Sequence, residues 1–212
     1  CVLAGPAGAE GRSPLIAVLV TLWGLRLAGY VAWRHDGEDR RYAAMRKRHG
    51  SSFALRSLLS VFVLQALIAW IVSTPIQLAA VDGTPSGIGA LALAGVLVCL
   101  VGLACEATAD FQLARFLAEP GSSEKVMDRG IWRYSRHPNY FGDATFWWGV
   151  FLIALESGSA WWGAIGPIVM TVFLLKVSGV ALTEKTISSR RPGYADYVER
   201  TSAFIPLPPK RR

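Results

Sequence analysis

Residues 88–117, IGALALAGVLVCLVGLACEATADFQLARFL, decide the fold of this chain. Residues 88–105 carry no charged side chain, and a helix needs roughly 20 apolar residues to cross the hydrocarbon core of a membrane. The apolar periodicity continues to Leu117, which extends the helix to about 45 Å at about 1.5 Å per residue. We therefore predict a membrane-spanning helix that projects beyond the membrane at its carboxyl end.

The composition of the whole chain agrees with a membrane protein. Of the 212 residues, 52% are hydrophobic and only 17% are charged, and the formal net charge is +7. About a quarter of the residues of a soluble domain are normally charged, so this chain has too little polar surface to cover a globule. These values exclude a soluble enzyme and a disordered chain.

Further apolar stretches occupy residues 15–33, 53–74, 138–155 and 160–182. The third of these reaches the length of a span because Pro138 suits the first position of a helix, where its missing N–H costs nothing. We predict an all-α, polytopic transmembrane helix bundle with about five spans, in a single membrane-embedded domain over residues 1–212. The first residue is Cys1 rather than Met, so we expect the chain to be N-terminally truncated.

The basic residues alternate with the predicted spans. Of the 22 Lys and Arg residues, six lie in residues 34–52, five in residues 112–136 and seven in residues 183–212, whereas residues 75–87 and 156–159 contain none. By the positive-inside rule, the three basic segments are cytoplasmic, including a C-terminal tail over residues 183–212. We expect an integral, multi-pass protein of the bacterial inner membrane with its C-terminus in the cytoplasm.

Two other kinds of partner are not expected. No recognisable nucleic-acid-binding module accompanies the net charge of +7, so we predict no nucleic-acid partner. The three cysteines, Cys1, Cys99 and Cys105, fit neither a metal-ligand spacing nor a disulfide framework, so we predict no metal site.

Ionisable residues inside a span are functional candidates because they are expensive to bury there. Glu106 and Asp110 share a helix face at the i,i+4 spacing, where two carboxylates repel each other. We expect a cation, a hydrogen-bond donor or a ligand between them; alternatively, they only solvate the end of the helix. Arg26 shares a face with Trp23 and Tyr30, and either contacts a ligand or pairs with a carboxylate of the bundle.

Residues 125–143, KVMDRGIWRYSRHPNYFGD, hold the densest group of polar side chains. Cations interleaved with aromatic rings at a membrane boundary can hold phosphates and stack on a flat ring. The alternative is a basic loop that lies on anionic lipid. The helix that starts at Pro138 has free N–H groups suited to an anion, and Asn139 and Asp143 share its inner face.

Several of these motifs resemble a known family. The segment WRYSRHPNYFGD, preceded by EATADFQ at residues 106–112 and followed by Glu184 and YADYVERTSAFIPLPP, resembles the bacterial DUF1295 family, as does LWGLRLAGYVAWRHDGEDRRYAAMR at residues 22–46. That family belongs with the steroid 5α-reductases and sterol reductases. The wider superfamily also holds isoprenylcysteine and phospholipid methyltransferases, which share the HPxYxG core. The resemblance covers residues 15–210.

The resemblance implies part of a seven-span membrane reductase, with NADPH held at the cytoplasmic side and a steroid-like or isoprenoid lipid entering from the bilayer. The cofactor-binding candidates that follow from it and from the basic loop are Glu106, Asp110, Lys125, Arg129, Arg133, Arg136, His137, Asn139, Asp143, Glu184 and Tyr197. The family usually has Glu where this chain has Asp143. In the steroid reductases, a Glu–Tyr pair is the acid that polarises the substrate carbonyl; the resemblance implies that its Tyr falls at Trp23 and that its Glu would lie upstream of this chain. The catalytic candidates are therefore Trp23, Arg26 and Tyr30, with the Tyr30 phenol as a substitute donor.

The implied reaction is hydride transfer from nicotinamide to the β-carbon of an enone, with a donor near the carbonyl oxygen. No GxGxxG loop follows a strand, so side chains and helix termini must hold the pyrophosphate. One alternative is an S-adenosylmethionine-dependent membrane methyltransferase, although Thr183 stands where such enzymes usually have the first of two glutamates. The other alternative is a non-catalytic membrane protein, which the Trp at position 23 favours.

Overall fold

The computed structural model describes residues 11–34, 40–81, 87–177, 179–188 and 191–210. Within these ranges the regular structure is helical, apart from an isolated bridge between Ser135 and Ser202. The predicted all-α bundle is confirmed.

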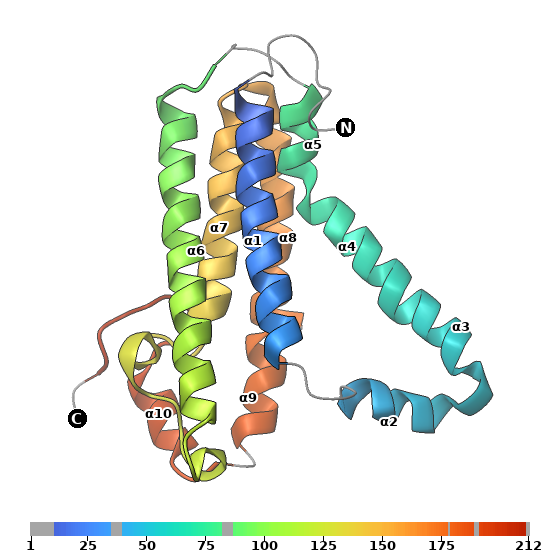
Figure 1. The fold of residues 1–212 in the computed structure, drawn as a ribbon, viewed down its shortest axis with the longest axis vertical. Helices are drawn as coiled ribbons and strands as arrows, with labels where there is room; N and C mark the ends of the chain where they lie inside the picture. The colour runs from blue at the N-terminus through green and yellow to red at the C-terminus, as the bar shows by residue number, and fades with distance from the viewer. Residues whose placement is uncertain (1–10, 35–39, 82–86, 178, 189–190, 211–212) are drawn as a thin grey trace.

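Four helices form the upright bundle in Figure 1. They are α1 (Arg12–Arg34), α6 (Ala90–Leu117), α7 (Pro138–Leu155) and α8 (Ile165–Val172). A second group leaves the bundle after α1: α2 (Arg40–His49) runs across its axis, α3 (Phe53–Ser57) and α4 (Leu64–Val72) run obliquely, and α5 (Thr74–Val81) returns to it. Below α8 lie α9 (Val180–Ser188) and α10 (Tyr194–Arg200). Short 3-10 helices cover Gly50–Ser52, Ser122–Glu124, Gly130–Arg133 and Ser159–Ala164, and π-helical turns cover Leu58–Val63 and Phe173–Val177.

Four helical stretches are long and apolar enough to cross a membrane. They are Arg12–Arg34, Tyr42–Val72, Ala90–Leu117 and Ala160–Val177, and they contain most of the predicted spans 15–33, 53–74, 88–105 and 160–182. Large apolar side chains are exposed along them; Leu55, Phe62 and Trp70 are 64%, 62% and 62% exposed. Such surfaces suit a lipid environment better than water.

The remaining predicted span, residues 138–155, forms α7 with these bounds but is not among the apolar four. Five apolar spans were expected, and the difference has a structural reason. Because α7 packs against α6, α5 and α8, Gly142, Phe146, Val150 and Ile153 are buried between helices. An inner helix can carry polar side chains toward its neighbours instead of lipid.

Residues 75–87, expected as a loop, begin inside α5. Pro75 lies in the first turn of this helix, where proline is tolerated because the N–H groups there have no helical partner. The apolar residues Ile76, Leu78 and Ala79 then pack in or against the buried cluster that includes Ile16 of α1 and Phe146 of α7. The chain therefore stays helical to Val81.

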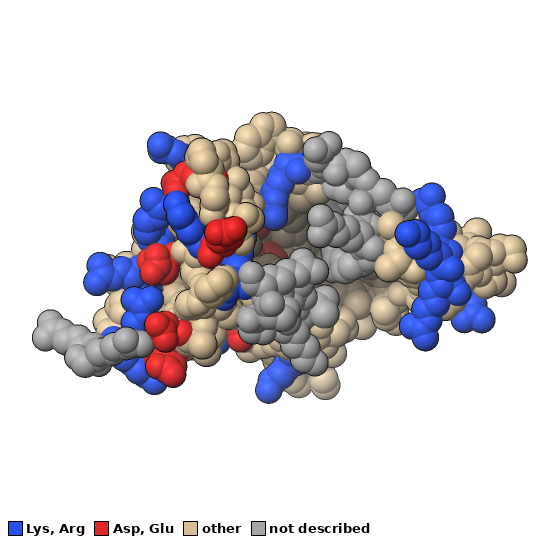
Figure 2. Space-filling view, turned by 90° about the horizontal axis from the view of Figure 1, so that it is seen from below, with Lys and Arg blue, Asp and Glu red and all other residues tan. Residues whose placement is uncertain are grey.

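The three predicted basic segments lie at one end of the bundle. This end, called the charged end from here on, carries α2, the segment between α6 and α7, α9 and α10 (Figure 1). Figure 2, seen from below, shows Lys and Arg side chains interspersed with Asp and Glu over this end. The described chain starts at the opposite end of the bundle (Figure 1).

Glycines bring α6 and α7 into backbone contact. A Cβ atom on Gly95 would lie 2.7 Å from the Gly149 carbonyl oxygen, and one on Gly102 would lie 2.5 Å from the Phe146 nitrogen. From the other side, a Cβ atom on Gly142 would lie 2.6 Å from the Glu106 nitrogen. Small residues spaced along both helices allow this approach, as in other membrane helix pairs.

The far end of the pair is closed by Glu156. Its Oε2 accepts a hydrogen bond of 2.6 Å from the Ala92 N–H in the first turn of α6. The N–H groups of a first turn have no helical partner, and a carboxylate there also interacts favourably with the helix dipole. The register of α6 against α7 is thus set at both ends.

We predict that Gly102→Ala destabilises the protein by about 1–3 kcal/mol, because the new methyl group would overlap the α7 backbone. The measurement is thermal unfolding in detergent, followed by tryptophan fluorescence. Gly24→Ala on α1 is the matched control, since no atom lies within 4 Å of its Cβ position. Equal melting temperatures for the two variants would contradict the packing argument.

Candidate functional site

A group of polar side chains lies between α1, α6 and α7, and is called the interior cluster. It consists of Trp23, Arg26, Glu106, Asp110 and Asp143. The Arg26 guanidinium pairs with both carboxylates of α6, through Nη2 with Glu106 and through Nη1 with Asp110 Oδ2 at 2.8 Å. The Trp23 indole N–H donates to Glu106 Oε2 at 3.1 Å. The predicted cation and donor between Glu106 and Asp110 are therefore present.

The third carboxylate, Asp143, has no such partner. Its Oδ1 atom is buried without a hydrogen bond, although its charge is close enough to interact with Glu106, Asp110 and Arg26. Gly142 holds this part of α7 against the backbone of Glu106. Within the described residues, the interior cluster thus places three carboxyl groups around one guanidinium.

Buried polar atoms without a hydrogen bond follow one face of α7. They are Asn139 Oδ1, Asp143 Oδ1 and Trp147 Nε1, spaced one helical turn apart. A buried polar atom without a partner costs about 1–3 kcal/mol. This face therefore suits a polar ligand that supplies the missing partners. The Tyr30 hydroxyl is also buried, and lies close to Arg34 and Asp110.

A cavity of about 240 Å³ opens at the charged end, next to this face. Asn139 contributes to its wall, so the cavity begins one helical turn from Asp143. Its other walls come from α6, α9, α10, the end of α1 and the segment before α7. The polar lining residues are Arg34, Arg136, His137, Asn139, Tyr140, Thr183, Arg191, Tyr194 and Tyr197.

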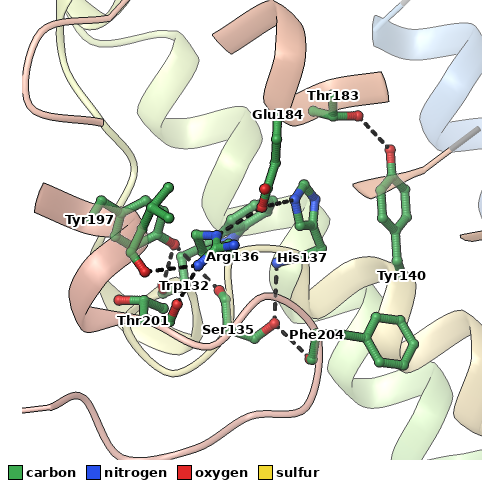
Figure 3. Close-up of polar contacts among 11 residues, drawn as sticks. Trp132, Ser135, Arg136, His137, Tyr140, Thr183, Glu184, Tyr197, Thr201 and Phe204 are labelled. Atoms are coloured by element: carbon green, nitrogen blue, oxygen red, sulfur yellow. Dashed lines mark hydrogen bonds and ion pairs between the residues drawn. The ribbon is translucent and has the colours of Figure 1, made fainter. Parts of the chain in front are cut away.

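Glu184 on α9 joins two of these residues, as Figure 3 shows. Its Oε1 accepts from Arg136 Nε at 2.8 Å and lies 3.2 Å from His137 Nε2. The His137 ring stacks on Tyr140, with ring centres 5.3 Å apart and planes 2° from parallel. Tyr140 and Thr183 form a hydrogen bond of 3.4 Å between their hydroxyl oxygens.

The C-terminal segment binds the loop before α7 through a set of contacts called the tail contact: Ser135, Arg136, Tyr197, Thr201 and Phe204 (Figure 3). The Arg136 Nη1 donates to the carbonyls of Thr201 and Val198 at 2.6 and 3.0 Å. The Tyr197 hydroxyl donates to the Trp132 carbonyl at 2.5 Å, and the Ser135 hydroxyl donates to the Phe204 carbonyl at 2.7 Å. The tail contact holds one wall of the cavity in place.

The basic candidates from residues 125–136 divide into two groups. Arg136 lines the cavity, whereas Lys125, Arg129 and Arg133 are exposed outside it. Arg129 pairs with Glu119 at 2.7 Å and lies over the Phe116 ring at 5.5 Å. The structure therefore brings Arg136, His137, Asn139 and Tyr197 together around the cavity, and leaves three loop cations apart from it.

Two arginines that line the cavity were absent from the predicted site. Arg34 ends α1, and it shares a face with Arg26 and Tyr30 because the three are spaced at i, i+4 and i+8. That spacing is a signal by which the sequence identifies Arg34. Arg191 follows α9 in an Arg-Pro-Gly segment without periodicity, so only the folding of α9 and α10 places it on the cavity.

With this geometry established, the chain can be compared with known proteins. The family model described as "Protein of unknown function (DUF1295)" matches residues 1–201. The chain belongs to the DUF1295 family. It is also 26% identical over 230 residues to the uncharacterized protein C594.04c of Schizosaccharomyces pombe, a match that covers 93% of this chain and 64% of that protein. The chain thus spans less than two thirds of this relative's length. No solved structure matches it significantly.

Burial sets the protonation of the groups around the cavity of this DUF1295 protein. Burial lowers the pKa of His137 below 6.5, although Glu184 opposes this shift. Burial also raises the pKa of Tyr194 to about 12, and it raises the pKa of Tyr197 further. At neutral pH, His137 is therefore neutral, and both tyrosines keep their hydroxyl protons.

We predict that Arg136→Met releases the C-terminal segment, because methionine can replace neither the pair with Glu184 nor the two bonds to carbonyls. Limited proteolysis in detergent should cut the residues after 190 at least several-fold faster than in the wild type. Arg133→Met is the control, since Arg133 is exposed outside the cavity. Equal cleavage rates would contradict this role of Arg136.

We also predict that His137 makes stability depend on pH. Because its pKa is lowered by folding, the unfolded chain takes up a proton more readily as the pH falls below 6.5. The contribution to stability is complete above pH 6.5 and decreases toward the lower pKa of the folded state. Thermal unfolding at a series of pH values should show this loss, and His137→Gln should reduce it while His49→Gln does not.

Proposed function

We propose that this DUF1295 protein is a membrane-embedded, NADPH-dependent reductase of a conjugated C=C bond in a steroid-like or isoprenoid lipid. One observation carries the proposal. The cavity at the charged end reaches Asn139, one helical turn from Asp143 of the interior cluster, and two of the helices around that cluster, α1 and α6, are apolar enough to cross a membrane. A water-soluble cofactor and a lipid could therefore meet at the interior cluster.

The buried residues of α7 suit the carboxamide of a nicotinamide nucleotide, and the cavity arginines suit its phosphates. Asn139 and Asp143 offer buried oxygen atoms without hydrogen bonds, which can accept the N–H groups of a carboxamide. The cavity adds arginine side chains for phosphates. When bound, the cofactor supplies the hydride, while the protein orients it and excludes water.

The catalytic candidates take different roles in this proposal. The Trp23 N–H is used by Glu106, and Arg26 is used by Glu106 and Asp110, so both position these carboxylates. The Tyr30 hydroxyl lies beside Asp110 and Arg34. Tyr30 is the proton donor that we propose for the developing enolate, since a donor near that oxygen stabilises it.

We also propose that the charged end faces the cytoplasm of a bacterial cell, where NADPH is available. The three basic segments at this end support the orientation by the positive-inside rule. The cationic cavity lining favours NADPH over S-adenosylmethionine, because the sulfonium of the latter is itself positive.

The test is a titration of the purified protein in detergent with NADPH and, separately, with S-adenosylmethionine. We expect saturable NADPH binding, and we expect Asn139→Ala to weaken it about tenfold, the effect of roughly 1.4 kcal/mol. Thr145→Val on the same helix is the control, because its hydroxyl bonds only to the Phe141 carbonyl. Consumption of NADPH with a panel of enone lipids then tests the reaction.

Each outcome has a distinct meaning. Binding of S-adenosylmethionine without NADPH would overturn the reductase proposal in favour of a methyltransferase. Binding of neither would favour a non-catalytic protein. Unchanged NADPH affinity in Asn139→Ala would show that the cofactor lies elsewhere.

A further inference from the structure

We infer that Arg34 and Arg191 are the phosphate-binding pair of this protein, and that the basic loop over residues 125–133 is not. The assignment rests on the proposed function, since the phosphates are those of NADPH. It replaces the cations that the sequence favours with two arginines that line the cavity.

The charge of the cavity wall is the first argument. Its described lining contains three arginines, Arg34, Arg136 and Arg191, and no Asp or Glu. Among the described residues, the carboxylates of Glu184 and Asp110 are paired with Arg136 and Arg26. A cleft lined by charges of one sign concentrates ligands of the opposite sign, so the cavity suits an anion.

The contacts of Arg136 exclude it as the main ligand for that anion. Its guanidinium already contacts Glu184 and the carbonyls of Val198 and Thr201, and only 9% of its side chain is exposed. Engaging a phosphate would break the tail contact. Arg136 therefore builds the wall, and two arginines remain on it.

The Arg191 side chain is held in position by contacts that leave most of its N–H groups available to a ligand. Its Nη1 donates to the Lys125 carbonyl at 2.6 Å, and its guanidinium lies 5.8 Å from the centre of the Phe116 ring. These contacts fix the side chain but use one of about five N–H donors. A planar guanidinium held in this way can present two parallel N–H groups to a phosphate.

Arg34 also lines the cavity, at the end of α1 and close to the buried Tyr30 hydroxyl. One helix thus carries Arg26 in the interior cluster and Arg34 at the cavity, two turns apart. Two turns of α-helix rise about 12 Å for eight residues. This arrangement places a phosphate site and the reactive end of a dinucleotide along the same helix.

The loop cations lie apart from the cavity. None of Lys125, Arg129 and Arg133 lines it, and Arg129 is paired with Glu119. Their place at the charged end suits anionic lipid headgroups instead.

The experiment measures binding of NADPH and of adenosine 2′,5′-bisphosphate to the purified protein in detergent, by calorimetry at two salt concentrations. The bisphosphate carries the phosphates without nicotinamide, so it reports on the cavity and not on the interior cluster. We expect Arg34→Gln and Arg191→Gln each to weaken both ligands about tenfold, as for loss of a charge-assisted hydrogen bond. Arg34→Lys and Arg191→Lys, which keep the charge, should retain part of the affinity.

Arg133→Gln is the matched control, and it should leave both affinities unchanged. Equal affinities for Arg34→Gln, Arg191→Gln and the control, with wild-type NADPH binding intact, would overturn the inference and leave the proposed function standing. A larger loss of affinity in Arg133→Gln than in Arg34→Gln and Arg191→Gln would also overturn the inference, because it would show that the loop binds the phosphates. If the wild type binds neither ligand, the proposed function itself fails. Melting temperatures identify a variant that misfolds, and the lysine variants then decide for that position.

Discussion

The backbone contact between α6 and α7 is the constraint on which the rest of the structure depends. Gly95 and Gly102 on one helix, and Gly142 and Gly149 on the other, leave no space for side chains between them. At such a distance even one added methyl group must displace a helix. The two helices therefore keep a single register, and that register decides which polar side chains can meet.

The interior cluster follows from this register. Glu106 on α6 and Asp143 on α7 come together because Gly142 packs on the Glu106 backbone. Carboxylates so buried need a cation, since desolvation otherwise disfavours their charge. Arg26 supplies it, and thereby binds α1 to the helix pair. The ion pairs of Arg26 with Glu106 and Asp110 thus hold α1 against α6 and α7, although each of these charges is expensive to bury in a membrane.

At the charged end, the tail contact decides which cations face the cavity. Arg136 and Tyr197 join the segment before α7 to α10 and the C-terminal residues. Arg136 and Tyr197 of this junction line the cavity, as does Arg191 between α9 and α10, whereas Lys125, Arg129 and Arg133 do not. Arg136 and Arg191 therefore differ in the hydrogen bonds that they already make: Arg136 binds Glu184 and two carbonyls, whereas Arg191 binds one carbonyl.

The amino-acid sequence was sufficient for the features that depend on local pattern. Long apolar runs predicted the helices, the start of α7 at Pro138 was correct, and the i,i+4 carboxylates correctly required a cation. Residues 75–81, which lie between two predicted spans, instead form most of α5, because proline is tolerated in the first turn of a helix. Only the tertiary structure decided which groups meet: that Arg26 is the cation for α6, that Arg136 is used by backbone carbonyls, and that Arg34 and Arg191 face one cavity. Periodicity acts between neighbours along the chain, whereas these contacts join residues that only the packing of separate helices brings together.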